Sequence, residues 1–378
     1  MSQSGIEVLL VLPQWLPEDA IWLANEIAAV IFPLTDPPVL IKGGEGSNRA
    51  ISQEGWIEER YSATPRGSTR VNHGAAIAHR LRERGFETGR MAIAGLSGTD
   101  LILTRQPEGY VNYTTVAHIR RELPDLEVVD GTPVMSASRH VKSEAEIELI
   151  RAGVKVAEAS ARVLTEMARP GVQQAEVFGS MVLQQMLSGA TGTMLSWCGG
   201  PWGEHKWRFM TPPPGVVQDS WYIGTEIGPE LRGYNCQVSE PVVVGEPDPM
   251  ALELFELGKI AFAATCDAMR AGRTWREVEK QVKSVAEGTP YDVELLVHGR
   301  GLGSEGPILI PVHDRGPEGD LPLMAGSTFI VKPYGYPLGP SYAHVTRSHD
   351  VTWGDTVVVT DHGAERLGTR PHELAVIG

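Results

Sequence analysis

Three side chains of this 378-residue sequence combine a reactive group with local sequence that can expose it to a ligand. His205 lies in CGGPWGEHKWRF, whose glycines and tryptophans suit irregular backbone beside a cleft, and an imidazole can take and return a proton near neutral pH. His298 opens the run HGRGLG, in which the glycines allow close approach of the backbone. Lys332 precedes a proline on the apolar run STFIVKP, so its stem is expected to be buried. These residue types indicate proton transfer and the binding of a polar substrate.

Each of these residues also has an interpretation without catalysis. His205 could be a loop histidine with no role, and His298 could be a core histidine with satisfied hydrogen bonds. A buried ammonium must be paired, but a desolvated lysine can also polarise a carbonyl, bind a carboxylate or act as a base. For Lys332 we favour pairing or substrate binding over Schiff-base chemistry.

Aromatic and basic residues supply further candidates for substrate binding. Aromatic side chains near His205 could form a wall for an apolar, planar or onium group, or could belong to the core. They are Trp197, Trp202, Trp207 and Phe209. The candidates for a substrate carboxylate could instead lie on the surface or at a subunit contact. They are Arg300, Arg347 and His344.

The composition restricts the class of partner. A formal net charge of -14 argues against nucleic acid, because phosphate binding needs clustered Lys and Arg. Three cysteines without metal-type spacing indicate a reducing compartment, so a cytoplasmic location is expected. No apolar run reaches the roughly 20 residues that span a bilayer, and the first residues lack a basic signal-peptide region. We therefore expect no membrane partner.

The pattern of helices and strands indicates two domains. Strands and helices are expected to alternate up to about Arg139, which is typical of an α/β domain with a mixed or parallel sheet. Ser143 and Glu146 then form a capping box that begins a long helix ending near Ala168. A second helix follows this one, and a similar helix pair recurs later in the chain. This repetition suggests an internal pseudo-two-fold symmetry. The recurring pair covers Pro249–Ala271 and Thr274–Glu287.

Several segments carry a family resemblance. From Tyr222 the chain reads YIGTEIGPELRGYNCQVSEPVVVG, followed by LLVHGRGLGSEGP, MAGSTFIVKPYGYP and VTWGDTVVVTDHGAERLG. In order and approximate spacing, and together with KSEAEIELIRAG, these segments resemble the family of prolidase, aminopeptidase P, methionine aminopeptidase and creatinase. The resemblance implies an α+β protein. A C-terminal pita-bread domain with a curved antiparallel sheet (residues 141–378) would follow a smaller creatinase-type N-terminal α/β domain (residues 1–140). It also implies a homodimer.

The resemblance implies that most of the family's metal ligands are replaced. Metal-dependent members hold two ions with two aspartates, one histidine and two glutamates. The matching positions here are, in order, Glu226, Gln237, His298, Lys332 and Gly354. An ammonium opposes metal binding by its charge and by its lack of a free lone pair, so we expect no metal cofactor. The resemblance also makes Glu226 the partner of Lys332, makes His205 the proton-handling residue, and places Glu305 where a second histidine often follows.

Creatinase, the metal-free member of that family, limits the choice of substrate. It keeps a loop histidine but grips a guanidinium group with two glutamates, whose matching positions look like Ser239 and Lys332. A guanidinium would therefore meet an ammonium, so creatine is a poor candidate. Glu240 does not compensate, because strand alternation points it to the other face from Ser239.

We therefore expect a metal-independent, creatinase-like hydrolase that cleaves a C–N bond of a small molecule by general acid-base catalysis and needs no cofactor. The expected catalytic residues are His205, His298, Glu226 and Lys332. The expected substrate-binding residues are Gln237, Trp202, Trp207, Glu305 and Arg300. The alternatives are a lyase using the same site, a non-catalytic module that binds a peptide or protein, and an atypical metallopeptidase that uses Glu226, His298 and Glu305.

Overall fold

The computed structural model describes residues 5–12, 28–43, 56–64, 71–96, 111–204, 206–302, 306–309, 319–338 and 351–378. The chain divides into two compact units, Met1–Arg139 and His140–Gly378. The boundary expected from the sequence lies between residues 140 and 141. None of the described helices combines the length and the apolar character that crossing a bilayer requires.

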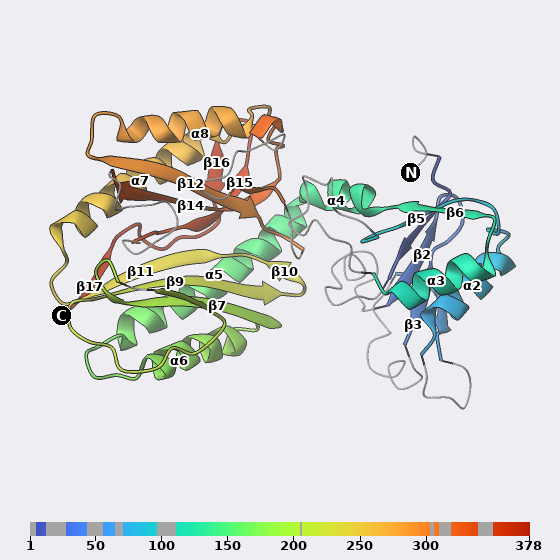
Figure 1. The fold of residues 1–378 in the computed structure, drawn as a ribbon, viewed down its shortest axis with the longest axis horizontal. Coiled ribbons are helices and arrows are strands. Elements are labelled where there is room, and N and C mark those ends of the chain that lie inside the picture. The colour runs from blue at the N-terminus through green and yellow to red at the C-terminus, as the bar shows by residue number, and fades with distance from the viewer. Residues whose placement is uncertain are drawn as a thin grey trace. The chain divides into compact units, whose positions relative to one another are not determined.

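The first unit is built on a six-stranded mixed sheet with the strand order β4-β3-β2-β1-β5-β6 (Figure 1). β1 pairs antiparallel with β2 and parallel with β5, and β5 pairs parallel with β6. Apolar residues of α2 and α3, such as Ile77 and Ile119, pack against one face of this sheet. The strands are β1 (Val8–Val11), β2 (Ala29–Pro33), β3 (Val39–Lys42), β4 (Glu59–Ser62), β5 (Gly89–Ile93) and β6 (Leu126–Asp130), and the helices are α2 (His73–Glu83), α3 (Tyr113–Glu122) and α4 (Thr132–His140).

The second unit contains two sheets, each covered by a pair of helices (Figure 1). The first sheet has the order β17-β11-β9-β7-β8, with β10 paired to β9, and the second has the order β13-β12-β14-β15-β16. The strands of the first sheet are β7 (Gly192–Pro201), β8 (Lys206–Phe209), β9 (Trp221–Leu231), β10 (Tyr234–Asn235), β11 (Val238–Val244) and β17 (Ala375–Ile377). Those of the second are β12 (Tyr291–Gly299), β13 (Ile308–Leu309), β14 (Thr328–Pro337), β15 (Asp355–Val359) and β16 (Ala364–Arg366).

Local hydrogen bonds fix where the helices of this unit begin. Ser143 accepts a hydrogen bond from the backbone of Glu146, and the Glu146 side chain accepts one from the backbone of Ser143, so the predicted capping box is confirmed. Thr274 and Glu277 form the equivalent box at the start of the fourth helix. The helices are α5 (Glu144–Met167), α6 (Gln174–Leu187), α7 (Pro249–Ala268) and α8 (Trp275–Lys283), followed by a 3-10 turn at Ser284–Ala286.

Strand alternation separates a face that packs on the helices from a face that carries the polar site residues on both sheets. In the first sheet, Ile223, Ile227 and Val238 pack into a core with α5 and α6, whereas Glu226 and Ser239 lie on the opposite face. In the second sheet, Val293, Leu295, Val297, Phe329 and Val331 pack into a core with α7 and α8. Lys332 and His298 belong to the other face of that sheet. We call the two polar faces the inner faces.

A short bridge joins the two sheets along their inner faces. The backbone N–H of Ser239 donates to Gly354 O at 2.9 Å, and the N–H of Gly354 donates to Ser239 O at 3.1 Å. Next to this bridge, the Gln237 N–H donates to Thr356 Oγ1 at 2.9 Å, and that hydroxyl donates to Gln237 O at 2.7 Å. The bridge therefore fixes residues of β11 against residues of β15, and it brings the polar residues of both sheets together.

Candidate active site

The centre of the site is an ion pair between the two inner faces. Glu226 comes from β9 and Lys332 from β14, and Lys332 Nζ donates a hydrogen bond to Glu226 Oε1. The two side chains are only 12% and 3% exposed. This is the pairing that the resemblance predicted. A buried ammonium without a partner would be costly, so the carboxylate makes the burial of Lys332 tolerable.

Gln237 and Arg300 form a second polar pair at the site. Arg300 Nη2 donates to Gln237 Oε1, and both residues are buried. The guanidinium can only donate, so it fixes the orientation of the carboxamide. Gln237 Nε2 is buried and has no hydrogen-bond partner in the described part of the chain. The amide therefore has a donor available for an acceptor atom of a ligand.

His298 lies on the inner face of β12 beside Lys332. It stands opposite Ile330 in the register of β12 and β14, so Lys332 is its diagonal neighbour on the same face. His298 is 4% exposed, and its Nδ1 lies 3.4 Å from the Gly299 carbonyl oxygen. Three of the four predicted catalytic residues thus come from neighbouring positions on the inner faces.

The remaining predicted site residues have different outcomes. Trp202 packs against Tyr222 with ring centroids 4.6 Å apart and ring planes tilted by 44°. Trp207 lies near Gly224, which shares the inner face of β9 with Glu226. Trp197 is not part of a substrate wall, because it is fully buried in the core between β7 and α6 and donates to Gln174 Oε1 at 3.1 Å. His205, Glu305, His344 and Arg347 lie outside the described residues, and the side chain of Phe209 is also outside them.

The residues present do not fit a centre for two metal ions. The matching positions supply an ion-paired ammonium, a carboxamide held by a guanidinium, and a glycine in place of carboxylates. A Cβ atom on Gly354 would collide with Lys332 Cγ and would lie 2.7 Å from the Val331 carbonyl oxygen. Among the residues that the structure describes, no group of three or more His, Cys, Asp or Glu side chains could hold a metal ion. Residue 354 therefore supplies no ligand atom, and the neighbouring strand leaves no room for a side chain at this position.

We predict that Gly354→Ala destabilises the protein by about 1–3 kcal/mol, because the added methyl group meets backbone that cannot move without shifting β14. Urea unfolding measures the difference. The matched control is Gly179→Ala on α6, where an added Cβ meets nothing within 4 Å. That variant should gain roughly 0.5–1 kcal/mol from helix propensity. Equal stability of Gly354→Ala and the parent protein would contradict the close packing of this position.

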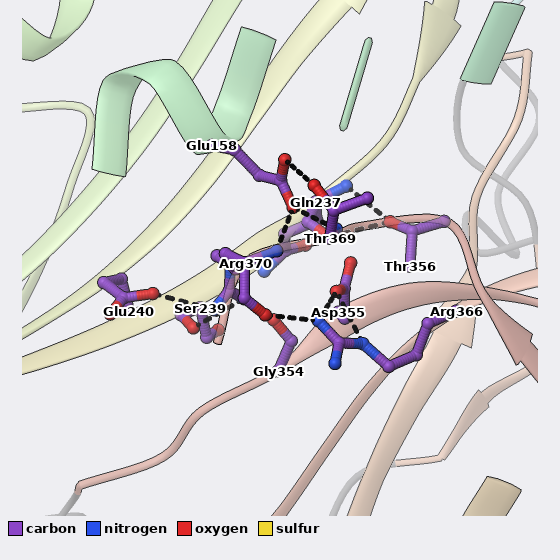
Figure 2. Close-up of polar contacts among 10 residues, drawn as sticks. All are labelled: Glu158, Gln237, Ser239, Glu240, Gly354, Asp355, Thr356, Arg366, Thr369 and Arg370. Atoms are coloured by element: carbon purple, nitrogen blue, oxygen red, sulfur yellow. Dashed lines mark hydrogen bonds and ion pairs between the residues drawn. The ribbon is translucent and has the colours of Figure 1, made fainter. Parts of the chain in front are cut away.

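A charged network behind the bridge was not anticipated from the sequence (Figure 2). Arg370 Nη1 donates to Glu240 Oε2 at 2.7 Å, and Arg370 Nη2 donates to the carbonyl oxygens of Ser239 and Gly354. The predicted orientation of Glu240, away from the face of Ser239, is confirmed by this contact. Arg370 therefore holds both strands of the bridge from the side opposite the Glu226–Lys332 pair. The sequence shows only Glu240 beside the apolar run PVVV, which indicates a carboxylate that needs a cationic partner but does not identify Arg370 as that partner.

Two further residues extend this network around Asp355. Arg366 Nη2 donates to Asp355 Oδ2 at 3.0 Å, and the Glu158 carboxylate accepts from the backbone of Thr369 and Arg370 (Figure 2). Burial raises the pKa of Asp355, while Arg370 and Arg366 oppose that shift. Burial also lowers the pKa of Arg370, and Glu240 opposes it. These paired charges fasten the C-terminal segment to α5 and to the bridge.

Comparisons with known proteins agree with this architecture. The probable dipeptidase PepE of Mycobacterium tuberculosis is 30% identical over 258 residues, which cover 65% of this chain and 63% of that protein. Creatinase of Bacillus sp. is 22% identical over 321 residues, which cover 80% of this chain and 72% of that protein. The crystal structure of X-Pro aminopeptidase from Thermotoga maritima has a TM-score of 0.74 at 18% identity and covers 100% of this chain and 97% of its own.

These comparisons confirm the expected α+β architecture with a pita-bread domain. The prolidase structure from Pyrococcus furiosus also matches, with a TM-score of 0.73 at 17% identity, and covers 98% of each chain. A sequence profile described as metallopeptidase family M24 matches residues 148–361, which is more than half of the sequence and includes all the ligand positions discussed above. The chain therefore belongs to metallopeptidase family M24.

Proposed function

We propose that this protein is a metal-independent hydrolase that cleaves a C–N bond of a small molecule by general acid-base catalysis. The observation that carries the proposal is the buried ion pair of Glu226 with Lys332, because it puts a fixed cation where a metal-dependent relative would need carboxylate ligands. Relatives named as dipeptidases and as a creatinase support the assignment to hydrolysis. Hydrolysis of a C–N bond needs a proton relay and a cation for the developing charge.

In the proposed reaction, His205 takes a proton from water as the water oxygen attacks the carbon of the C–N bond. Lys332 stabilises the negative charge that develops on the substrate, and Glu226 orients the ammonium group. His205 then returns the proton to the departing nitrogen, and the C–N bond breaks. Gln237 Nε2 donates to an acceptor atom of the substrate, and His298 contributes a second imidazole beside Lys332.

We predict that the purified protein, after dialysis, retains far less than one equivalent of transition metal per chain. Elemental analysis measures zinc, manganese, iron and cobalt. The control is the double variant Gln237→Asp with Lys332→Glu, handled in the same way, which should retain more metal because it restores carboxylates at two of the family's ligand positions, in addition to Glu226 and His298. A stoichiometric metal in the parent protein would overturn metal independence and favour the atypical metallopeptidase.

A second measurement separates hydrolysis from elimination. Turnover in water enriched in oxygen-18 places the label in the product of hydrolysis, whereas a lyase reaction incorporates none. A broad screen of small amides, ureas, amidines and amino-acid derivatives supplies the substrate for this measurement. If the screen finds no turnover and the protein binds a peptide or protein tightly, the non-catalytic module replaces the proposed function.

A further inference from the structure

The second unit contains a pocket of about 530 Å³ on the side of β11 that faces α5. Its volume lies in the range that is usual for sites of small molecules, roughly 300–1,000 Å³. The α5 residues that line it repeat with helical spacing, so they form one stripe along the helix. The charged and polar lining residues are Glu158, Arg162 and Thr165 from α5, Glu240 from β11, and Thr369, Arg370 and Glu373 from the C-terminal segment.

Of the two buried carboxylates that line this pocket, only Glu240 has an oxygen available to a ligand among the described residues. Glu158 is already occupied, because it accepts from the backbone N–H groups of Thr369 and Arg370 and from the Thr369 hydroxyl. Glu240 is different: its side chain is 9% exposed, and Oε2 accepts from Arg370 Nη1. Its Oε1 accepts no hydrogen bond from any residue that the structure describes. A nearly buried carboxylate with one unused oxygen favours a ligand that donates hydrogen bonds.

A cationic group lies at the same pocket. Arg162 is exposed and lines the pocket four residues after Glu158 on α5. Its guanidinium makes no hydrogen bond or ion pair with another residue of the described ranges, whereas Arg370 uses both terminal nitrogens within the network (Figure 2). A guanidinium offers paired donors that match a carboxylate. Within the part of the chain that the structure describes, the pocket thus presents a negatively charged hydrogen-bond acceptor, Glu240 Oε1, and a positively charged donor group, the Arg162 guanidinium.

We propose that this pocket binds a small zwitterion of the amino-acid type, with its ammonium group held by Glu240 Oε1 and its carboxylate held by Arg162. The volume leaves room for a side chain beside the two charged groups. Glu373 is exposed at the pocket and adds negative charge to its lining. This site lies behind β11, away from the inner faces, and the inference does not rest on the proposed hydrolysis.

A single side chain, that of Arg370, connects the pocket to the bridge at the candidate active site. Arg370 contacts Glu240 at the pocket and the carbonyl oxygens of Ser239 and Gly354 at the bridge. A ligand that changes the partner of Glu240 therefore acts on the guanidinium that holds the bridge. Arg370 gives the pocket a direct physical connection to the strands that carry the inner-face residues.

The protonation of Glu240 supplies a further observable. Burial raises the pKa of Glu240 to about 7, with Asp355 and Glu158 adding to the shift and Arg370 opposing it. Only the ionised carboxylate attracts an ammonium strongly, so affinity should fall as the pH is lowered through 7. This holds while the ammonium and carboxylate of the ligand keep their own charges across that range.

The test is isothermal titration calorimetry of the full chain with a panel of free L-amino acids. Each amino acid that binds is compared with its amine analogue, which lacks the carboxylate, and with its acid analogue, which lacks the ammonium. For L-leucine these are 3-methylbutylamine and 4-methylpentanoate. We expect at least one amino acid to bind, and both of its analogues to bind about 10- to 100-fold more weakly, which corresponds to the loss of one charged hydrogen-bonded contact.

Variants assign the binding to this pocket. Glu240→Gln should weaken binding of the amino acid and of its amine analogue but leave binding of the acid analogue unchanged. Arg162→Gln should weaken binding of the amino acid and of its acid analogue but leave binding of the amine analogue unchanged. Because Glu240→Gln breaks a buried pair and could prevent folding, Thr165→Phe provides an independent test by filling the pocket without touching that pair. Its control is Glu166→Phe, an exposed neighbour on α5 that does not line the pocket and should bind as the parent does.

The proposal fails if no amino acid of the panel binds at about millimolar concentration, the weak end of specific binding. It also fails if binding survives Thr165→Phe but is lost in Gln237→Leu, because the ligand would then occupy the inner faces. A failure of the proposed hydrolysis would not count against the amino-acid pocket, because each of these experiments measures binding and none measures turnover.

Discussion

Replacing Lys332 with Met is expected to lower the free energy of unfolding by about 3–5 kcal/mol, because the substitution leaves Glu226 buried without its partner. The double variant Lys332→Met with Glu226→Leu should recover most of that loss, since it removes both charges and keeps apolar volume. Urea unfolding of the parent, the two single variants and the double variant gives the interaction energy directly. A large favourable coupling is the expected result.

A surface pair provides the matched control for this experiment. Lys259 and Glu256 on α7 are 3.8 Å apart and are 45% and 65% exposed. Lys259→Met should therefore change stability by no more than roughly 0.5 kcal/mol. Additive effects of the two substitutions at Glu226 and Lys332 would show that the charges do not depend on one another. The ion pair would then no longer support the proposed metal-independent site.

Replacing His205 with Ala is expected to lower turnover of the substrate by roughly 10²–10⁴-fold, the contribution of a general acid-base residue. His205→Gln should do little better, because an amide forms hydrogen bonds but does not exchange a proton near neutral pH. The parent rate should depend on one ionisation near neutrality, and that dependence should be absent from the residual rate of both variants. Steady-state kinetics across pH, with urea unfolding in parallel, separates lost catalysis from lost folding.

An exposed histidine elsewhere in the chain controls for the substitution itself. His362 follows β15 at the surface, so His362→Ala should keep the parent rate and its pH profile. Full activity of His205→Ala on a substrate that the parent turns over would show that another group moves the proton. His298 on β12 would then be the first candidate, since it lies beside Lys332 on the inner face.

Much of the fold could be predicted because its signals are local. The capping box of Ser143 and Glu146 marks the start of α5 through hydrogen bonds within one turn of helix. The alternation of β11 placed Ser239 and Glu240 on opposite faces before any contact was known. The positions of the aromatic residues near His205 were harder to predict, because an apolar ring suits a pocket and a core equally well. Trp197 belongs to the core because the parity of β7 points it at α6.

The sequence by itself determined the chemistry available at the site: an ammonium, a carboxamide and a glycine stand where the family's metal ligands would be. The tertiary structure decided which groups meet. Lys332 pairs with Glu226 across 106 residues of chain, and Gln237 is held by Arg300 across 63, because strand register and the bridge at Gly354 bring these positions together. The contacts of Arg370 and the pocket behind β11 could also be recognised only in the tertiary structure. Side-chain type is a local property, whereas the partner of a buried charge depends on packing between segments that are remote in the sequence.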